Sequence, residues 1–532
     1  MTSPGTGLLT PTLSPSSGRG GALLIAAITL AAYLPVVRAG WVWDDDTHVT
    51  SNFALRDARG LRLIWTRLGA TPQYYPLTHT TFWIERRLWG DRPIGYHLTN
   101  VILHALCAIV LWRILSHLKL KGALLCACIF AVHPINVESV AWVTERKNVL
   151  SGVFYMSAAL MYLRGPYLAA LLLFACALLS KTVTGTLPAA LMVILWWKQR
   201  RFPTRDLIRL LPMFALALVA GSLTAHLERT IVGASGPEWQ MGWVQRTLIA
   251  GRAVWFYAAK ILVPVDLTFI YARWNVSAAE WWQFGFPVSA GCVGLALFML
   301  RRRLGAGPLV AVALFVGTLF PALSFANVYP MRFSFVADHF AYLACVPVLA
   351  LASAVLARLG RMAWAIPLLL GASTFNHARE FRDSRTLWDA TLEKNPSAWI
   401  AHDQLGARDA ASGDVPSALG HFQTALDLNP SHIEAHVGMA NVLCGVGSYD
   451  AAIEHCRIAV RIRPDNVLPH YALGAALSAS GDLEGAVQAY NDALRVEPKF
   501  APARLRLAEL LKRLGRDTEA REQYDRARGP IE

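Results

Sequence analysis

Apolar residues dominate this chain of 532 residues up to about residue 375, and the remainder is polar. A helix needs roughly 20 predominantly apolar residues to cross a bilayer. Several of the apolar runs approach that length, and others fall short of it. The pattern predicts membrane-spanning helices over residues 21–38, 94–116, 122–136, 149–163, 166–180, 182–198, 207–225, 284–300, 308–324, 339–357 and 361–376.

Segment 246–263 decides the number of crossings. It is apolar, but it carries Arg252 and Lys260 and ends at Pro264. Counting it as a crossing would place the basic triplet 301–303 outside, although short basic loops normally stay in the cytoplasm. We interpret the segment as re-entrant or interfacial, which predicts about eleven crossings and places both the first loop and the polar tail outside. The seven arginines in residues 41–93 argue against this topology, although long loops translocate despite their charge.

The polar tail repeats with a period of 34 residues. Proline, glycine and alanine recur at that spacing in four series: Pro396, Pro430, Pro464 and Pro498; Gly413, Gly447, Gly481 and Gly515; Ala418, Ala452, Ala486 and Ala520; Ala425, Ala459, Ala493 and Ala527. Gly suits the turn between two helices, Ala allows their close approach, and Pro follows the second helix. The period is typical of tetratricopeptide repeats, whose stacked helices offer a groove for extended peptides. A purely structural array or a dimer contact is the alternative.

These patterns together predict an all-α protein with two main domains. We expect a disordered N-terminus over residues 1–20 and a membrane domain over residues 21–376. A linker with the end of a degenerate repeat follows over residues 377–396. The four complete repeats then occupy residues 397–430, 431–464, 465–498 and 499–532.

Composition supports a membrane protein and argues against several other classes. The chain is 55% hydrophobic and only 16% charged, too apolar for a soluble protein. Its net charge of +14 lies largely in short loops, where it orients membrane helices, so it does not indicate nucleic-acid binding. The cysteines form no paired metal-ligand pattern, and no phosphate-binding glycine loop or common hydrolase motif is present.

The first candidate site is the acidic run Asp44, Asp45 and Asp46, directly after the first predicted span. Adjacent carboxylates repel one another, which raises a pKa or recruits a cation. Either outcome suits a general base beside an acceptor hydroxyl. A hydrated start of a loop explains the same residues equally well.

The second candidate is segment 133–147, which begins at His133. If it is one helix, Glu138, Trp142 and Glu145 share a face, and the following Arg146 and Lys147 are available to an anionic head group. The alternative is an interfacial belt of aromatic and charged residues.

Further polar residues lie near the ends of other apolar runs. Arg332 suits a phosphate, and Asp338 and His339 suit a hydrogen-bonded pair, although a loop ion pair is the alternative. Lys181 lies between two spans, where a lysine either snorkels or reaches a phosphate. Tyr75 and His97 begin a series of polar groups near the first loop.

Taken together, these motifs resemble the transmembrane and tetratricopeptide-repeat proteins, relatives of the protein O-mannosyltransferases with the GT-C glycosyltransferase fold. The resemblance covers nearly the whole chain and rests on the repeats and on WDDDTHVTSN (43–52), YYPLT (74–78), GYHLTNVILHAL (95–106), HPINVESVAWVTERKNVL (133–150), SKTVTGTLP (180–188) and ADHFAYL (337–343). It implies a polyprenyl-phosphate-linked sugar donor, a protein hydroxyl as acceptor and a site on the external face.

The resemblance also suggests roles for residues. Asp44 and Asp45 match the acidic pair of the family's first external loop, and Asp44 is our candidate for the base. On chemical grounds we expect cations to hold the leaving polyprenyl phosphate, and the candidates are Arg146, Lys147, Arg332 and Lys181. The remaining polar residues are expected to support the site: Asp46, Tyr75, His97, His133, Glu138, Glu145, Asp338 and His339.

Two departures from the family leave the sugar open. Asp338-His339-Phe340 stands where relatives usually have a DRY-type motif, and His48 stands where a tyrosine often follows the acidic pair. The energy would come from the activated phosphate ester, so no ATP is needed. A divalent cation at Asp44 and Asp45 stays an alternative, because relatives of this class need not use a metal.

The leading hypothesis is a glycosyltransferase in a bacterial-type inner membrane that modifies exported proteins, with mannose or another hexose as the sugar. The repeats would bind the acceptor outside the cytoplasm. A noncatalytic scaffold for envelope proteins and a glycan ligase or polymerase are the two alternatives.

Overall fold

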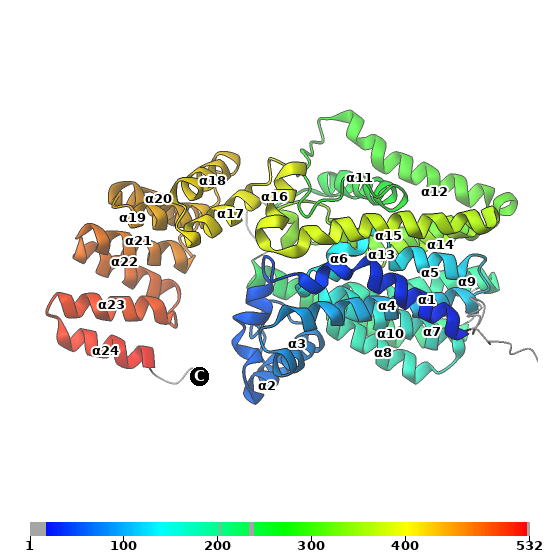
Figure 1. Cartoon of the computed structure of the whole chain (residues 1–532), viewed down its shortest axis with the longest axis horizontal. Coiled ribbons are helices and arrows are strands. Elements are labelled where there is room, and N and C mark those ends of the chain that lie inside the picture. The colour runs from blue at the N-terminus through cyan, green and yellow to red at the C-terminus, as the bar shows by residue number, and fades with distance from the viewer. Residues whose placement is uncertain (1–17, 202–203, 234–238, 529–532) are drawn as a thin grey trace, which may run out of the picture. The chain divides into compact units, whose positions relative to one another are not determined.

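The computed structural model describes residues 18–201, 204–233 and 239–528, and over these residues it contains helices and turns but no strand (Figure 1). The predicted all-α class is confirmed. The chain divides into two compact units, Met1–Leu387 and Trp388–Glu532. Of the N-terminal segment predicted to be disordered, residues 1–17 lie outside the described residues, and Gly18 already begins the first helix.

The first unit holds the apolar helices and the loops that carry the candidate residues. Its helices are α1 (Gly18–Ala32), α2 (Ala58–Thr66), α3 (Pro76–Trp89), α4 (Pro93–His117), α5 (Ala123–Ala131), α6 (Val137–Ala141), α7 (Arg146–Arg164), α8 (Tyr167–Ser180), α9 (Leu187–Gln199), α10 (Thr204–Leu227), α11 (Trp243–Leu262), α12 (Gly285–Leu304), α13 (Gly307–Leu319), α14 (Cys345–Leu356) and α15 (Ala365–Ala378). Helix α4 packs against α1, α5 and α7, which places it in the middle of the unit.

Several helices are long and apolar enough to cross a membrane. Within the described residues four helical segments qualify, namely Pro93–His117, Thr204–Val232, Trp281–Leu304 and Cys345–Arg382. A fifth is added if the pair α5 and Pro134–Ala141, bent by 52°, counts as one span. Helix α12 buries none of its residues and leaves Val288, Leu295 and Met299 exposed, as a lipid-facing helix does. The chain is a membrane protein, and the count of about eleven crossings stays a prediction.

Segment 133–147 is not the single helix that its spacing suggested. Helix α6 ends at Ala141, Trp142 is extended with ψ of 119°, and a 3₁₀ turn, η5 (Val143–Glu145), precedes α7. The shared helical face predicted for Glu138, Trp142 and Glu145 is therefore wrong. The break matters because it turns the backbone N–H of Thr144 toward Asp45 of the first loop.

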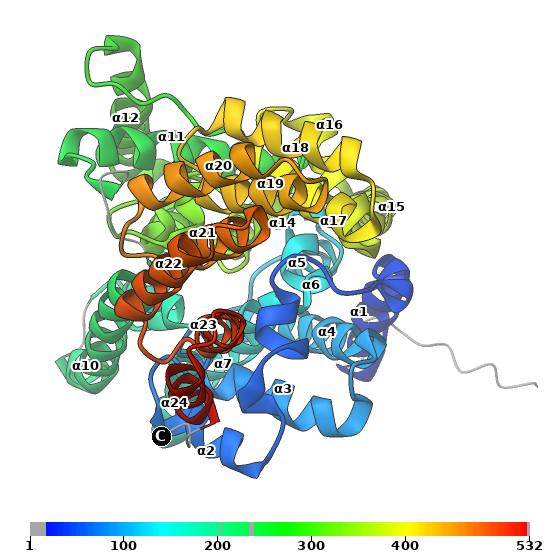
Figure 2. The ribbon, with the colours of Figure 1, turned by 90° about the vertical axis from the view of Figure 1, so that its left-hand side faces the viewer.

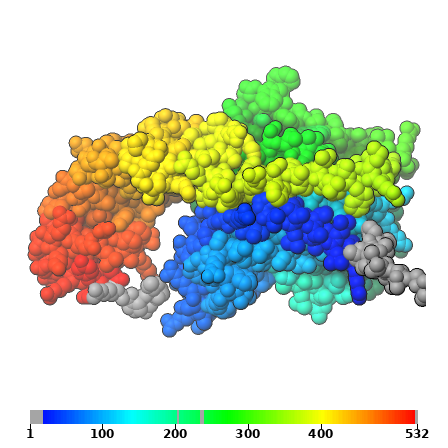
Figure 3. Space-filling view, in the orientation of Figure 1, coloured from blue at the N-terminus to red at the C-terminus, as the bar shows by residue number. Residues whose placement is uncertain are grey.

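The second unit is a series of antiparallel helix pairs that follow one another in chain order (Figure 2), and the colours of the space-filling view follow the same order (Figure 3). A preceding helix, α16 (Ser384–Lys394), spans the boundary between the two units. The pairs are α17 (Trp399–Ser412) with α18 (Val415–Leu428), α19 (Ile433–Gly445) with α20 (Tyr449–Ile462), α21 (Val467–Ser480) with α22 (Leu483–Val496), and α23 (Ala501–Arg513) with α24 (Asp517–Arg528).

The periodic residues take the positions that the repeat predicts. The glycines of the intra-repeat turns have φ between 71° and 95°, a conformation that costs glycine little. Ala418, Ala452 and Ala486 are 0% exposed where the two helices of a pair meet. Each periodic proline comes two residues after the end of a helix, as with Leu428 and Pro430. The predicted tetratricopeptide architecture is confirmed.

Candidate functional site

The acidic run lies in a tight turn directly after Trp43, whose backbone adopts φ of 46°. Positive φ is rare for a bulky residue and indicates local strain. The Trp43 ring stacks on Trp142 with ring centroids 5.3 Å apart, and it meets Phe269 edge-on. This aromatic packing holds the backbone of Trp43 in its strained conformation and thereby orients the side chains of Asp44 and Asp45.

Asp45 is buried and bridges two segments. Its Oδ1 accepts hydrogen bonds from the backbone N–H and the hydroxyl of Thr144, at 2.8 and 2.7 Å, and its Oδ2 accepts one from Val42 N–H at 3.0 Å. Burial and the charge of Asp44 raise the pKa of Asp45 to about 7, against these hydrogen bonds, which favour the ionised form. Asp45 therefore connects the first loop to η5.

Asp44 keeps part of its carboxylate group exposed. Its side chain is 31% exposed and Oδ2 lies 3.6 Å from Nε2 of His48, whereas Oδ1 is buried without a hydrogen-bond partner among the residues that the structure describes. Burial raises the pKa of Asp44 to about 6, while Lys147 lowers it and Glu145 raises it further. A partly exposed carboxylate with a pKa near neutral suits proton abstraction. Asp46, by contrast, is exposed and accepts from Thr47 N–H.

Glu145 holds two lysines from different segments. Its Oε1 pairs with Nζ of Lys147 at 2.9 Å, and its Oε2 pairs with Nζ of Lys181 at 3.2 Å. Glu145 is 1% exposed, whereas the lysines keep 10% and 13% of their side chains exposed. The lysines hold the pKa of Glu145 well below its usual range, against burial, which would raise it. Glu145 alone does not neutralise both ammonium groups, although the carboxylate of Asp44 also acts on Lys147.

Arg146 does not take the phosphate-binding role expected of it. Its side chain is fully buried, and its Nη1 pairs with Glu85 at 2.8 Å. The guanidinium also donates to Asn100 Oδ1 and to the Tyr96 carbonyl. Because its side chain is 0% exposed and its donors bond inside the protein, Arg146 is not accessible to a ligand. It joins α7 to α3 and α4.

The expected pair of Asp338 and His339 is also replaced by other partners. Nδ1 of His339 lies 2.6 Å from Oε1 of Glu138, and its backbone N–H donates to the other oxygen of Glu138 at 2.9 Å. Asp338 instead accepts a hydrogen bond from the Tyr271 hydroxyl at 2.8 Å. Asn148 donates to the His339 carbonyl and accepts from Lys181. It thereby connects the pair of His339 and Glu138 to the lysines.

The remaining candidates divide between the cluster and its surroundings. Tyr75 is buried at the start of α3, and the charges of Lys147 and Glu145 act on its hydroxyl. His97 bonds the Gly40 carbonyl at 3.2 Å and His133 bonds the Ile261 carbonyl at 2.9 Å, so both support the fold around the cluster. Arg332 is partly exposed with its Nη1 3.4 Å from the Tyr329 hydroxyl.

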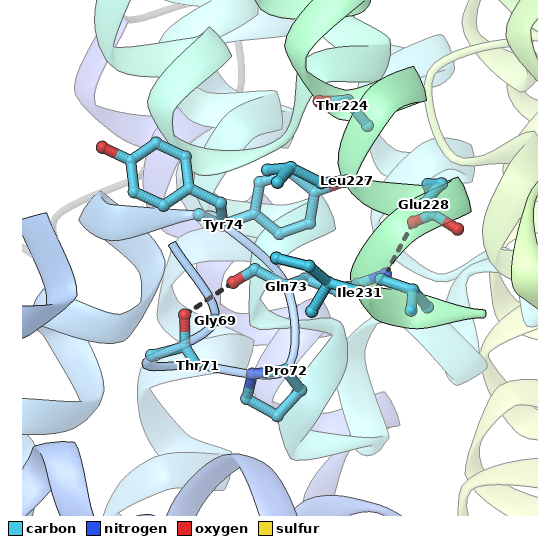
Figure 4. A pocket seen from close by; sticks show the side chains of 11 residues that line it. Gly69, Thr71, Pro72, Gln73, Tyr74, Thr224, Leu227, Glu228 and Ile231 are labelled. Atoms are coloured by element: carbon cyan, nitrogen blue, oxygen red, sulfur yellow. Dashed lines mark hydrogen bonds between the residues drawn. The ribbon is translucent and has the colours of Figure 1, made fainter. Parts of the chain in front are cut away.

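Two residues that the sequence did not single out complete the cluster. Gln73 accepts from Nζ of Lys147 at 3.2 Å and donates to Glu228 at 3.4 Å, and Glu228 also accepts from Tyr329 N–H (Figure 4). Both line a small pocket between loop 69–75 and the end of α10. The sequence could have indicated Glu228, because it is a carboxylate directly after an apolar run. No sequence feature indicated Gln73.

The described part of the chain contains no group of three or more His, Cys, Asp or Glu side chains arranged to hold a metal ion. The candidate cation ligands Asp44 and Asp45 do not converge on a common point in the hydrogen-bond pattern, since both Asp45 oxygens are used by Thr144 and Val42. The lysine pair supplies the positive charge of the cluster instead.

Comparison with known proteins gives matches to the tail and to a group of enzymes. The tetratricopeptide-repeat family model matches residues 409–477 and 477–529. Human protein O-mannosyl-transferase TMTC3 is 31% identical over 151 residues, which cover 26% of this chain and 16% of that protein. Protein O-mannosyl-transferase F38B6.6 of Caenorhabditis elegans is 22% identical over 281 residues, covering 49% and 41%.

The chain thus spans less than half the length of these curated relatives. Among solved structures, MamA from Desulfovibrio magneticus RS-1 is 22% identical, covers 32% of this chain and 93% of its own, and has a TM-score of 0.25. The resemblance seen in the motifs is confirmed: residues 409–529 are tetratricopeptide repeats, and the chain is similar to the protein O-mannosyl-transferases of the transmembrane and tetratricopeptide-repeat family.

Proposed function

We propose that this chain is a membrane glycosyltransferase that moves a hexose from a polyprenyl-phosphate donor to a hydroxyl group of a protein. The observation that carries the proposal is the partly exposed carboxylate of Asp44 in the same polar cluster as Lys147 and Lys181. A base and a pair of cations are the two groups that such a transfer requires. Mannose is the sugar favoured by the names of the relatives.

In the proposed reaction, Asp44 accepts the proton of the acceptor hydroxyl. The oxygen then attacks the anomeric carbon of the sugar, and the bond between that carbon and the phosphate oxygen breaks. With a pKa of about 6, Asp44 is mostly ionised at neutral pH and still basic enough to receive the proton. Asp45 contributes by holding Thr144, which keeps Glu145 and its lysines at a fixed distance from the turn.

The leaving polyprenyl phosphate gains a negative charge as the bond breaks. Lys147 and Lys181 are the groups that would bind this charge, because each is partly exposed and both are already oriented by Glu145. Their positions are set before the substrate arrives, so little reorganisation is needed in the transition state. We assign Arg332 a secondary place, at the edge of the cluster, through its contact with Tyr329.

We further propose that the repeats bind the acceptor protein and that they lie on the external side of the membrane with the acidic turn. A reporter fused after Glu532 tests the location. Activity of a reporter that functions only outside the cytoplasm supports it, and activity of a cytoplasmic reporter overturns it.

The experiment for the function is intact-mass measurement of exported proteins from cells with and without the gene, followed by transfer with purified protein in detergent. Loss of hexose-sized mass increments without the gene, restored by wild type but not by the Asp44→Asn variant, supports the proposal. Unchanged masses favour the scaffold, for which the repeat tail is the supporting observation. Transfer to a lipid-linked glycan with none to protein favours the ligase or polymerase.

A further inference from the structure

The first two repeats each contain a pair of histidines that face one another between their two helices. His402 of α17 and His421 of α18 have their Nδ1 atoms 3.1 Å apart. His436 of α19 and His455 of α20 repeat the arrangement at 3.0 Å. The members of each pair are 19 residues apart, and the pairs are 34 residues apart, so the arrangement follows the repeat.

The other ring nitrogen determines what each pair can do. Nε2 of His402 lies 3.4 Å from the Pro396 carbonyl, and Nε2 of His436 lies 3.1 Å from the Pro430 carbonyl. A carbonyl only accepts, so Nε2 of His402 and of His436 carries the proton, and Nδ1 of each of these two neutral rings presents a lone pair toward its partner. The facing Nδ1 of His421 or His455 then carries the hydrogen of the contact, and a cation can take the place of that proton.

This arrangement matches the surroundings of histidines that bind metals. Such histidines generally donate their second ring N–H to a backbone carbonyl or a carboxylate, which fixes the ring and the tautomer. The proline carbonyls do this for His402 and His436. In the first repeat the buried carboxylate of Asp409 lies 3.7 Å from Nε2 of His421, whereas the equivalent position in the second repeat is Leu443.

The last two repeats provide an internal comparison. His470 keeps the bond from Nε2 to its proline carbonyl, Pro464, at 2.9 Å, but Ala489 takes the place of the second histidine. In the fourth repeat Arg504 and Gln523 occupy the two positions and bond to each other at 3.2 Å. The helix pair therefore forms without the histidines, and their presence in two repeats is not required by the packing.

We propose that each of the first two repeats binds one borderline transition-metal ion, such as Zn²⁺ or Cu²⁺, through the paired Nδ1 atoms of His402 with His421 and of His436 with His455. A tetrahedral zinc ion needs its nitrogen ligands about 3.3 Å apart, so each pair has to open by only a few tenths of an ångström. The described residues supply no third His, Cys, Asp or Glu ligand to complete a cluster, so water fills the other positions. Imidazole suits both ions.

The test is metal binding by the full chain in detergent, by competition of Zn²⁺ with a chromophoric chelator. We expect His421→Ala and His455→Ala each to lose one bound ion relative to wild type, and the double variant to lose two. His470→Ala is the matched control, because His470 has the same proline contact but faces Ala489 instead of a second histidine. This variant should lose no bound ion. Cu²⁺ bound to wild type should show electron paramagnetic resonance splitting from two nitrogens at these sites.

The alanine variants reproduce the residue that the third repeat already carries at position 489, and circular-dichroism melting checks that they fold. The proposal is overturned if the double variant binds as many zinc ions as wild type. It is also overturned if His470→Ala loses as much bound zinc as His421→Ala, since histidines of the repeats would then bind metal without regard to pairing. Neither outcome depends on glycosyltransferase activity.

Discussion

Arg146 and Lys147 are neighbours in the chain, but they belong to two different regions of the first unit. Arg146 is buried beside α3: its charge is paired with that of Glu85 and its side chain is 0% exposed. Lys147 lies in the cluster around Glu145, where part of its side chain reaches the surface. Both regions contain a buried acid and a cation. A cation that keeps some exposure to solvent, rather than basicity alone, therefore distinguishes a candidate anion site from a buried structural ion pair.

The largest effect on stability that we predict comes from the closed region around Arg146. Arg146→Met leaves Glu85 buried without its partner, which should lower the free energy of unfolding by about 3–5 kcal/mol. Thermal unfolding in detergent measures the loss. Lys147→Met is the matched control, with a much smaller change, and adding Glu85→Leu to Arg146→Met should restore part of the stability. Equal melting temperatures of the Arg146→Met and Lys147→Met variants would contradict the distinction between the two regions.

The next effect concerns binding of the donor in the open region. Lys147→Met and Lys181→Met should each weaken transfer roughly 10- to 100-fold, because each removes a charge-assisted contact to phosphate. Both variants should fold normally. Titration with a polyprenyl phosphate alone separates loss of binding from loss of chemistry. Wild-type affinity in both variants would exclude the lysines from the phosphate site.

A smaller effect on stability is predicted for Asp45. Asp45→Asn replaces one acceptor oxygen by an amide, so that a buried N–H of Val42 or Thr144 loses its acceptor. The cost should be about 1–3 kcal/mol, with a partial loss of transfer because η5 moves relative to the turn. Thermal unfolding and transfer are measured on the same sample. Full transfer with unchanged melting would show that the link between the turn and η5 is dispensable.

The smallest predicted effect is a shift in the dependence on pH. If Asp44 acts as the base, transfer should rise with pH through a midpoint near 6 and reach a plateau above it, because only the ionised form accepts a proton. Lys147→Met removes a charge that lowers this pKa, so its profile should move to higher pH. Glu145→Gln removes a charge that raises it and should move the profile the other way. Shifts in the same direction would contradict the assignment.

The sequence predicted the repeats more completely than the site for a physical reason. Each repeat is built from contacts within one period of 34 residues, so Gly413 or Ala418 can be placed from spacing alone. The site depends on contacts between distant segments. Thr144 meets Asp45 across 99 positions and Lys181 meets Glu145 across 36, and no local pattern specifies such pairs.

Local reasoning failed where the backbone departs from a regular helix. The break at Trp142 could not be read from the spacing of Glu138 and Glu145, yet both acids still reach the cluster, each with a different partner. Arg146 and Lys147 looked equivalent because a sequence does not reveal burial. The sequence picked out the acidic run as a group, and only the hydrogen bonds separate Asp44 from Asp45.

The measurement that tests the central claim most directly compares Asp44→Asn with Asp46→Asn in a transfer reaction with purified protein, a polyprenyl-phosphate-linked mannose and an acceptor protein. The two residues are close in the chain, but Asp46 is exposed and its carboxylate accepts a hydrogen bond from the N–H of its neighbour Thr47. The account predicts that Asp44→Asn loses transfer by about 10²–10⁴-fold with unchanged melting, while Asp46→Asn keeps most of it. Equal transfer by the two variants would contradict the assignment of Asp44 as the base.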